Sequence, residues 1–381
     1  MRSGRVLPRV LSASFVATAA LLQACSSPNT GGAIGPGYEP SSSGGASNNN
    51  GSSSGGSSSG GSSSGATSGS SSGSSSGGTA ATGNTISADA TWANGMTISE
   101  ATTIAAGVTV TIAKGATINV AAGVVITVAG TLTATAGTPH AILTGTGWTG
   151  MVIPAGGTIT ADSLDITGAA TPMDVTGNAT YDNATITGAN TAIDVEINGT
   201  LSMTGATITG TLGESFINGA FTASHLDYER GPGEGVQIAN AASVVKIDNS
   251  TFHGTGDVAG DMIISNACES LTMTYTAITG CHCAYHFGGI TSFDIENMDI
   301  NSDSYGFMMY GSSPTAGTRV FKNSNVETEA AAGIDESGTN GAITVSGVYF
   351  DTSSKLQLTD QEITISDAAT SALPATSVGP Q

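Results

Sequence analysis

The chain has 381 residues, of which only 10% are charged and 5% aromatic, while 54 are glycine. Nine basic residues against 29 acidic residues give a formal net charge of -20. Nucleic acids and anionic bilayer surfaces bind clustered lysine and arginine, so this balance excludes nucleic acid as a partner and leaves divalent cations and neutral polysaccharide as candidate ligands.

Residues 1–24 have the features of a secretory signal peptide: three arginines, then an apolar segment too short to span a bilayer. The segment ends in Leu22-Gln23-Ala24-Cys25, which resembles the bacterial lipobox. The resemblance implies cleavage before Cys25 and fatty acylation of that cysteine, such as with palmitate. Two or more acyl chains anchor a protein stably to a membrane. Ser26 then suggests the outer membrane, on its surface or periplasmic face; an ordinary secretory leader with an incidental Cys25 is the alternative.

Residues 25–84 consist mainly of serine, glycine, asparagine and threonine. Such a segment buries too little apolar surface to offset its conformational entropy, so we expect it to be disordered. A chain of this length and composition has a reach of roughly 40–45 Å. The segment is therefore predicted to be a flexible tether.

Beyond residue 85 the sequence repeats. Between 104 and 127 the unit is eight residues long, an alternating strand broken by glycine at its fourth position. A longer repeat follows, with a mean spacing of 23 residues, or about three such units. Its apolar anchors are Ile166, Ile186, Ile208, Leu226, Phe252, Ile278, Ile300, Val326 and Phe350. Three strands per repeat predict a coil of triangular cross-section that stacks on itself.

A second recurring position lies three residues before the anchors and favours a left-handed corner, because asparagine and glycine tolerate that backbone conformation. It is occupied by Asn183, Asn249, Asn297 and Asn323, and elsewhere by Ser163, Gly205, Ala223 and Gly347. Together these patterns resemble the right-handed parallel β-helix of the pectate-lyase-like superfamily. We expect an all-β solenoid of eleven to twelve coils over residues 85–366, and a flexible tail over 367–381.

Each anchor is followed by an apolar-x-apolar strand whose middle residue should point outward. The predicted ligand-binding face consists of Asp174, Asp194, Asn218, Gln237, His286 and Asp335, with Ile263 and Met308 in the same column. In polysaccharide-active β-helices such a face carries the substrate groove. A merely solvated sheet face is the alternative interpretation.

Two of these residues suggest a cation site. Equivalent positions in adjacent coils lie about 4.8 Å apart, so Asp174 and Asp194 would bring two like charges together. That repulsion predicts either a raised pKa or a bound cation. Calcium suits the oxygen ligands, with Asn218 as a further one, but it prefers six to eight, so binding should be weak.

Catalytic candidates are few. A lyase that removes a sugar proton needs a basic residue and carboxylates, and Arg230 with Asp194 and Asp227 is the only such combination. Arg230 lies in a lengthened loop, which is where a solenoid usually gathers binding groups. An exposed turn in which Arg230 pairs with a neighbouring glutamate is the alternative.

Three cysteines remain besides Cys25. Cys268 could form a disulfide with Cys281 or Cys283, leaving one thiol. Buried thiols are the second interpretation. The third is a metal site in the run from Cys281 to His286, which also contains His282, although the two cysteines are closer than zinc sites usually space them.

The sequence therefore favours a lipid-anchored envelope protein that displays a rigid β-helix for binding, structural or adhesive work. Its expected partners are the membrane, and polysaccharide or another envelope protein. A polysaccharide lyase or glycoside hydrolase acting on acidic or neutral polysaccharide is the alternative function.

Overall fold

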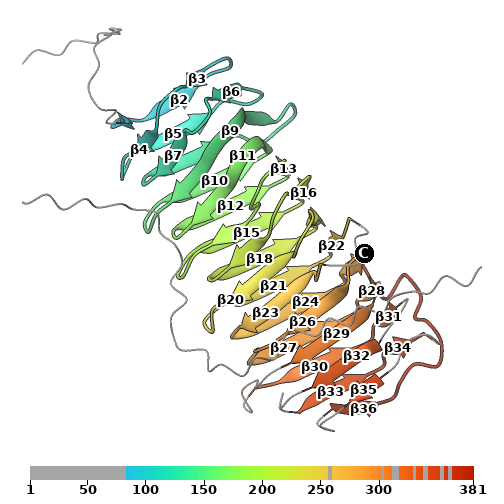
Figure 1. The fold of residues 1–381 in the computed structure, drawn as a ribbon. Helices are drawn as coiled ribbons and strands as arrows, with labels where there is room; N and C mark the ends of the chain where they lie inside the picture. Colours follow the sequence, from blue (N-terminus) through green and yellow to red (C-terminus); the bar gives the residue numbers. More distant parts are fainter. Residues whose placement is uncertain are drawn as a thin grey trace, which may run out of the picture. The chain divides into compact units, whose positions relative to one another are not determined.

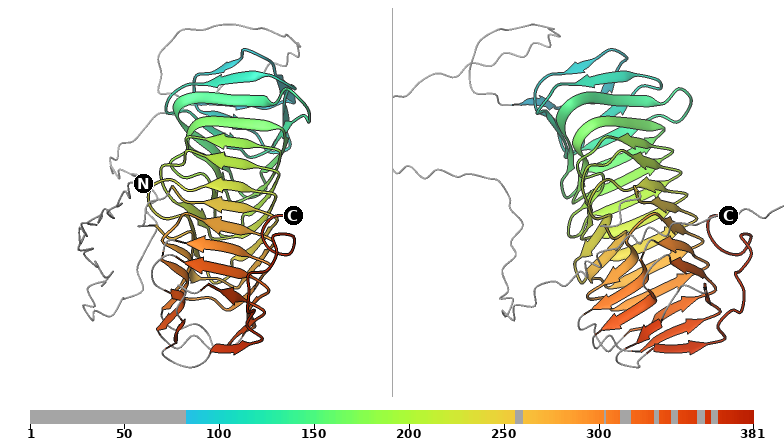
Figure 2. Two further views of the ribbon diagram at one scale, coloured as in Figure 1. Left: turned by 90° about the vertical axis from the view of Figure 1, so that its right-hand side faces the viewer. Right: turned by 45° about the vertical axis from the view of Figure 1, so that its right-hand side comes forward.

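A computed structural model describes residues 83–255, 260–302, 304–310, 317–328, 332–337, 342–351, 356–358 and 363–381. These residues form parallel β-strands and no helix, and successive turns stack along one axis (Figure 1, Figure 2). The predicted parallel β-helix is confirmed, with about 11 turns. The signal peptide at 1–24, the lipidation site Cys25 and the tether up to residue 82 lie outside the described residues. In the part of the chain that is described, no helix is long and apolar enough to cross a bilayer.

The strands form three faces, because each turn contributes one strand to each. Face 1 is a 13-stranded parallel sheet. It contains β2 (Ala90–Trp92), β5 (Thr109–Ile112), β8 (Thr131–Ala134), β10 (Thr158–Asp162), β12 (Asn178–Asp182), β15 (Thr200–Thr204), β18 (Ala220–Ser224), β21 (Val244–Asp248), β24 (Ser270–Thr274), β27 (Ser292–Glu296), β30 (Arg319–Lys322), β33 (Ile343–Ser346) and β36 (Ile363–Ser366).

Faces 2 and 3 are joined where two long strands, β9 (Ala141–Ile153) and β11 (Leu164–Val175), run around the corner between them. Face 2 contains their first halves together with β3 (Thr97–Ile98), β6 (Thr117–Val120), β13 (Thr185–Thr187), β16 (Thr207–Thr209), β19 (Asp227–Glu229), β22 (Thr251–His253), β25 (Ala277–Thr279), β28 (Asp299–Ser302), β31 (Asn325–Thr328) and β34 (Tyr349–Phe350). Face 3 contains their second halves together with β1 (Asn84–Ile86), β4 (Thr102–Ile104), β7 (Val125–Val128), β14 (Asp194–Val195), β17 (Ser215–Ile217), β20 (Val236–Ala239), β23 (Ile263–Ala267), β26 (Cys283–Phe287), β29 (Tyr305–Tyr310), β32 (Ala332–Ser337) and β35 (Leu356–Leu358).

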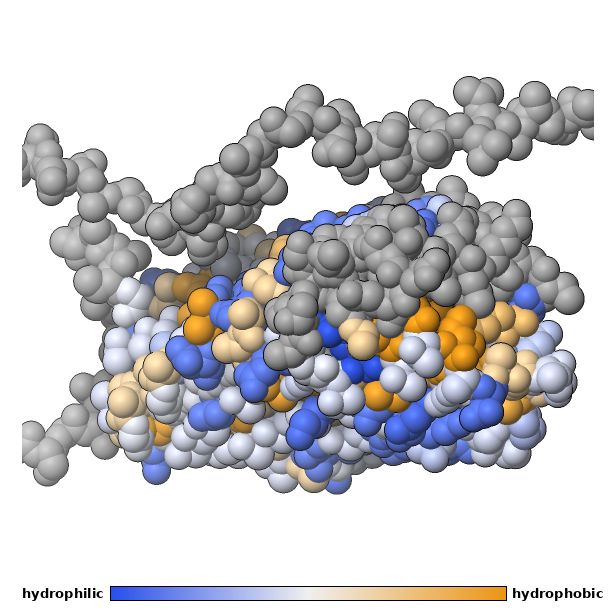
Figure 3. Space-filling model, turned by 90° about the horizontal axis from the view of Figure 1, so that it is seen from below, coloured by the Kyte–Doolittle hydropathy of each residue, from blue (hydrophilic) through white to orange (hydrophobic). Residues whose placement is uncertain are grey.

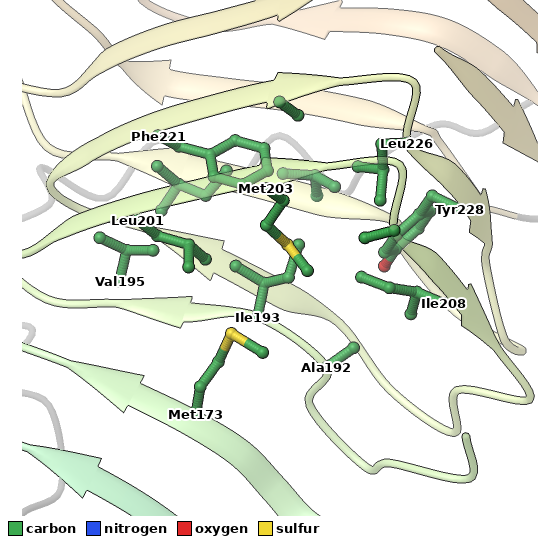
Figure 4. Close-up of a cluster of buried hydrophobic side chains, with 14 of the residues drawn as sticks. Met173, Ala192, Ile193, Val195, Leu201, Met203, Ile208, Phe221, Leu226 and Tyr228 are labelled. Atoms are coloured by element: carbon green, nitrogen blue, oxygen red, sulfur yellow. The ribbon is translucent and has the colours of Figure 1, made fainter. Parts of the chain in front are cut away.

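The core is a column of apolar side chains enclosed by the three faces. Strands alternate buried and more exposed residues, so every second side chain points inward. Figure 4 shows Leu201 and Met203 of face 1 directed toward Ile193 and Ile208 from the other faces. Each turn buries too little surface to be stable alone, and stacking on neighbouring turns completes the core.

The 23-residue repeat is confirmed at every anchor but one. Ile186, Ile208 and the later anchors pair in register along face 2, from Ile166 to Phe350. The exception is Leu226, because Ile208 pairs with Tyr228 instead. Both residues are buried, and the aromatic side chain of Tyr228 takes the inward position of the strand.

The corner between faces 1 and 2 has the predicted left-handed backbone. Its positive φ residues are Ser163, Asn183, Gly205, His225, Asn249, Tyr275, Asn297, Asn323 and Gly347. The sequence prediction places Ala223 at this corner, three residues before Leu226. The anchor of this turn is Tyr228, so His225 occupies the corner instead. At Gly205, a side chain would also collide with Asn183 Oδ1 of the preceding turn.

Residues 367–381 are not the flexible tail that the sequence predicts. They pack back along this corner, and the end of the chain lies near β22 and β28 (Figure 1). Asn325 exchanges two hydrogen bonds with the backbone of Leu373, at 2.8 and 3.1 Å. Gly379 N–H donates to the Asn297 carbonyl at 2.9 Å, and Val378 is buried.

The surface is polar but carries little charge. The side of the solenoid seen in Figure 3 is mainly hydrophilic, with hydrophobic areas separated by polar ones. Among the described residues, the large exposed hydrophobic side chains are Ile197 and Leu212. Serine and threonine thus supply most of the polarity, as the composition indicates.

Candidate functional site on face 3

A column of outward-pointing residues runs along face 3, one from each turn. In register it contains Asp174, Asp194, Phe216, Gln237, Ile264, His286, Met308 and Asp335. All of the residues predicted for the ligand-binding face lie in it except Asn218. We call this set the face 3 column.

Asn218 and Ile263 were assigned to the column wrongly. In β17 the outward residue is Phe216 and the inward residue is Ser215, which is fully buried and lies 3.1 Å from Tyr228 Oη. In β23 the outward residue is Ile264, next to the inward Ser265. Both strands have a serine on the inside and an apolar residue on the outside, the reverse of the usual alternation. A prediction that assigns apolar residues to the inside therefore misplaces the outward residue of these strands.

The acidic end of the column is formed by two aspartates in adjacent turns. Asp174 pairs directly with Asp194 across β11 and β14. Burial, then the charges of Glu196 and Asp174, raise the pKa of Asp194 to about 7. Burial and Glu196 also raise the pKa of Asp174. The expected repulsion of like charges is therefore present, with Glu196 as a third carboxylate.

The next turns add an amide and further carboxylates. Gln237 Nε2 donates to Glu214 Oε2 at 2.5 Å. Glu234 Oε2 accepts a hydrogen bond from the backbone N–H of Asp261 at 2.7 Å. Burial raises the pKa of Glu234, although this hydrogen bond and the nearby charge of Arg230 oppose the shift.

Asp261 is the centre of a histidine cluster. Its Oδ1 lies 3.1 Å from His282 Nδ1, and its Oδ2 lies 2.6 Å from His286 Nδ1. Burial would raise the pKa of Asp261, but hydrogen bonds from both histidines hold it far below its usual value. The hydrogen bond to Asp261 raises the pKa of His286, against the opposing effect of burial. This carboxylate is therefore ionised between two imidazoles.

Two sulfur atoms border the cluster. Cys283 Sγ lies 3.1 Å from His282 Nδ1 and 2.7 Å from Met308 Sδ. Cys283 is fully buried, and burial together with the charge of Asp261 raises the pKa of its thiol far above the usual value. Cys283 therefore does not have the lowered thiol pKa of a nucleophilic cysteine.

The expected disulfide is not formed. Cys268, Cys281 and Cys283 are buried thiols. Cys268 Sγ–H donates to the carbonyl of Ser243 at 3.4 Å, which keeps it at the corner beyond β23. Cys283 Sγ instead lies beside the histidine cluster, 3.1 Å from His282 Nδ1.

Aromatic groups continue the site on the other side. Tyr310 Oη donates to Asp335 Oδ2 at 2.9 Å, and its ring meets His286 edge-on at a centroid distance of 5.6 Å. Tyr305 meets His282 in the same way at 5.5 Å. These contacts give both histidines a fixed ring orientation.

The lyase candidates are not assembled. Arg230 is fully buried, and Gly260 packs so closely against its guanidinium that a side chain at 260 would collide with it. Asp227 lies on face 2, where it pairs with His253 at 3.2 Å, while Asp194 lies on face 3. Arg230 supports the lengthened loop from within, instead of forming an exposed turn.

Sequence reasoning missed much of the cluster. The run from Cys281 to His286 carried a signal, and His282 and Cys283 do come together. Asp261 gave none, because it sits in a lengthened loop before β23 that follows no repeat. Glu214, Glu234 and Tyr310 lie beside the column and not in it, so a periodic pattern does not find them.

Comparison with known proteins gave no match: no family model, no curated protein and no solved structure is similar to this chain. The site must therefore be interpreted from its own geometry.

Proposed function

We propose that this protein is an envelope-tethered β-helix that binds a neutral polysaccharide along face 3. The carrying observation is the face 3 column, which aligns carboxylates, an amide, an imidazole and one aromatic ring over eight successive turns. From Asp174 to Asp335 the column spans seven strand spacings, or about 34 Å. That shape suits an extended polymer better than a small molecule.

The chemistry of the column supports a sugar ligand. Carboxylate and amide oxygens accept hydrogen bonds from hydroxyl groups, while Gln237 and His286 also donate them. Phe216 and Tyr310 offer ring surfaces to the apolar faces of sugar rings. The site thus combines polar groups that fix orientation with aromatic contact area.

The charge of the site selects against acidic polymers. Asp174, Asp194, Glu196 and Glu214 concentrate negative charge at one end, and among the described residues no lysine or arginine lies in the column. A polyuronate would be repelled unless cations bridged it. A neutral polysaccharide is therefore the preferred ligand, and another envelope protein is the alternative partner.

The tethering proposal depends on Cys25. Its lipobox resemblance supports acylation and outer-membrane delivery, and the glycine- and serine-rich segment would hold the β-helix away from the bilayer. A Cys25→Ser variant should leave the membrane fraction, while a Cys268→Ser variant should remain in it. Sedimentation of the Cys25→Ser variant with membranes after a high-salt wash would disprove the anchor.

Binding is tested with the full-length protein against neutral and acidic polysaccharides by affinity electrophoresis. Phe216→Ala and Gln237→Ala should each weaken binding of a neutral polymer about tenfold, equivalent to about 1.4 kcal/mol. Thr222→Ala and Lys246→Ala alter exposed residues on face 1 and should have no effect. Equal binding by all four variants would show that face 3 is not the binding surface.

A glycoside hydrolase is the second candidate, because Asp174 and Asp194 are neighbouring carboxylates, one of which has a pKa of about 7. Glycosidases use such a pair, with the protonated member as general acid. Release of reducing ends that is lost in Asp194→Asn, and retained in Lys246→Ala, would establish this activity. The buried Arg230 gives the lyase alternative no comparable support.

A further inference from the structure

We propose that Asp261, His282 and Cys283 form a binding site for a zinc ion on face 3, independent of the polysaccharide-binding function. Among the described residues these three form the one group of histidine, cysteine and carboxylate donors whose ligand atoms all lie within 4.8 Å of one another. The three residues come from two turns of the helix, so the fold brings them together.

The donor atoms already have nearly the spacing that zinc requires. Bonds of 2.0–2.3 Å in a tetrahedral site place ligand atoms roughly 3.3–3.8 Å apart. His282 Nδ1 lies 3.1 Å from both Asp261 Oδ1 and Cys283 Sγ. A small outward movement of the side chains would therefore admit the ion.

The backbone holds these ligands rigidly. Cys283 accepts a hydrogen bond from Met262 N–H at 2.8 Å, and His282 N–H donates to Gly260 at 2.9 Å. The backbone N–H of Asp261 donates a hydrogen bond to Glu234 Oε2. The backbone carbonyl of Asp261 accepts a hydrogen bond from Gly235 N–H at 2.8 Å. Cys283 lies in β26, whereas Asp261 and His282 lie just before their strands, and these hydrogen bonds fix them to the neighbouring turns.

An ion can reach the cluster from solvent. The side chain of His286 is 34% exposed and that of His282 is 18% exposed, whereas Cys283 lies beneath them. The imidazoles are therefore the part of the cluster that solvent reaches, while the carboxylate of Asp261 and the thiol of Cys283 are buried. His286, whose Nδ1 contacts Asp261, is the nearest further imidazole for the fourth position.

A catalytic cysteine does not explain the arrangement. In a Cys-His-Asp relay the histidine uses one ring nitrogen for the nucleophile and the other for the carboxylate. Here Cys283 Sγ and Asp261 Oδ1 both approach Nδ1 of His282. Two potential metal ligands that converge on one nitrogen fit a shared cation better than a proton relay.

The donor set selects the metal. One thiolate, one imidazole and one carboxylate are the three ligand types that zinc takes, whereas calcium and magnesium take oxygen alone. Met308 Sδ lies next to Cys283 Sγ, and a thiolate with a thioether would instead favour Cu(I). The carboxylate of Asp261 at the centre favours zinc.

The test uses full-length protein, purified metal-free under reducing conditions, with Zn²⁺ titrated in competition with a chromophoric chelator. We expect one Zn²⁺ per chain, and a loss of affinity of at least tenfold in both Cys283→Ser and His282→Gln. Matched controls are Cys268→Ser, a buried thiol elsewhere, and His253→Gln, which belongs to the His-Asp pair on face 2. Both controls should bind as the wild type does.

A second measurement requires no variant. Co²⁺ added to the wild-type protein should give a thiolate-to-cobalt charge-transfer band, which Zn²⁺ abolishes by displacement and Ca²⁺ does not. Absence of this band, or of stoichiometric Zn²⁺ binding, would overturn the proposal. Equal weakening in the Cys268→Ser and Cys283→Ser variants, or binding of Cu(I) without Zn²⁺, would overturn it as well.

Discussion

Asp174 and Asp194 occupy equivalent positions in adjacent turns, where they pair directly across β11 and β14. Both are partly buried, and the pKa of each is raised, that of Asp194 to about 7. A parallel β-helix repeats each position at the spacing of a strand, so like charges in one column must share one local environment. This pair makes the acidic end of the column sensitive to protons and cations.

The first prediction concerns pH. Between the ordinary carboxyl pKa of 3.8 and about 7, Asp194 is protonated in the folded protein but ionised in the unfolded chain. The folded state then binds more protons, so its stability falls as pH rises through this window. The Asp194→Asn variant has no carboxyl group at this position, so it does not lose stability in this way as pH rises. The melting temperature of the variant relative to the wild type should increase between about pH 4 and about pH 8.

Thermal unfolding monitored by circular dichroism across this range checks the prediction. Asp182→Asn, on face 1, is the control, and its effect should not change with pH in the same way. A difference between Asp194→Asn and wild type that stays constant with pH would contradict the raised pKa.

The second prediction concerns calcium. Asp174, Asp194 and Glu196 supply carboxylate oxygens, but Phe216 stands where Asn218 was expected, so the amide ligand is missing from the column. Water must complete the shell that calcium prefers, and binding should be weak. Millimolar calcium should raise the melting temperature of the full-length protein above that in chelator. An equal shift in the Asp174→Asn/Asp194→Asn double variant would show that calcium acts elsewhere.

The sequence contains enough information for the solenoid because its repeats are short and local. The anchors from Ile166 to Phe350 follow one spacing, and asparagine or glycine marks the corner before them. The register is lost where an inward serine replaces an apolar residue, as at Ser215 and Ser265. There a hydrogen bond satisfies the buried hydroxyl, which no hydropathy pattern records.

The site was less predictable than the fold. The Asp174 and Asp194 pair follows from periodicity alone. Asp261 reaches His282 and His286 only because a lengthened loop returns to the edge of β23, and loop paths do not repeat. The packed C-terminal segment was missed for a similar reason, since its partners, such as Asn325, lie far away in sequence.

The third prediction concerns the core. Ile208 is fully buried on face 2 between Ile186 and Tyr228 of the neighbouring turns. Ile208→Ala should cost about 2–5 kcal/mol of unfolding free energy, because it removes buried contacts and leaves a cavity. Thr209→Ala, one residue away and outward-facing, should be nearly neutral. Chemical denaturation measures both, and equal costs would contradict the inward column.

The fourth prediction concerns the C-terminal segment. Asn325 is 6% exposed, and its side-chain amide both donates to and accepts from the backbone of Leu373. Asn325→Ala breaks both hydrogen bonds and leaves the Leu373 backbone groups to find other partners. The expected cost is about 1–3 kcal/mol. Amide exchange over residues 369–381 should accelerate while that of face 1 stays unchanged.

Asn301→Ala is the matched control, because Asn301 is an exposed asparagine on the adjacent strand β28. It should alter neither stability nor exchange in the C-terminal segment. If residues 369–381 exchange rapidly already in the wild type, the Asn325–Leu373 pair does not hold them. Slow exchange that is lost only in Asn325→Ala would establish that this buried amide fastens the end of the chain to the corner of the solenoid.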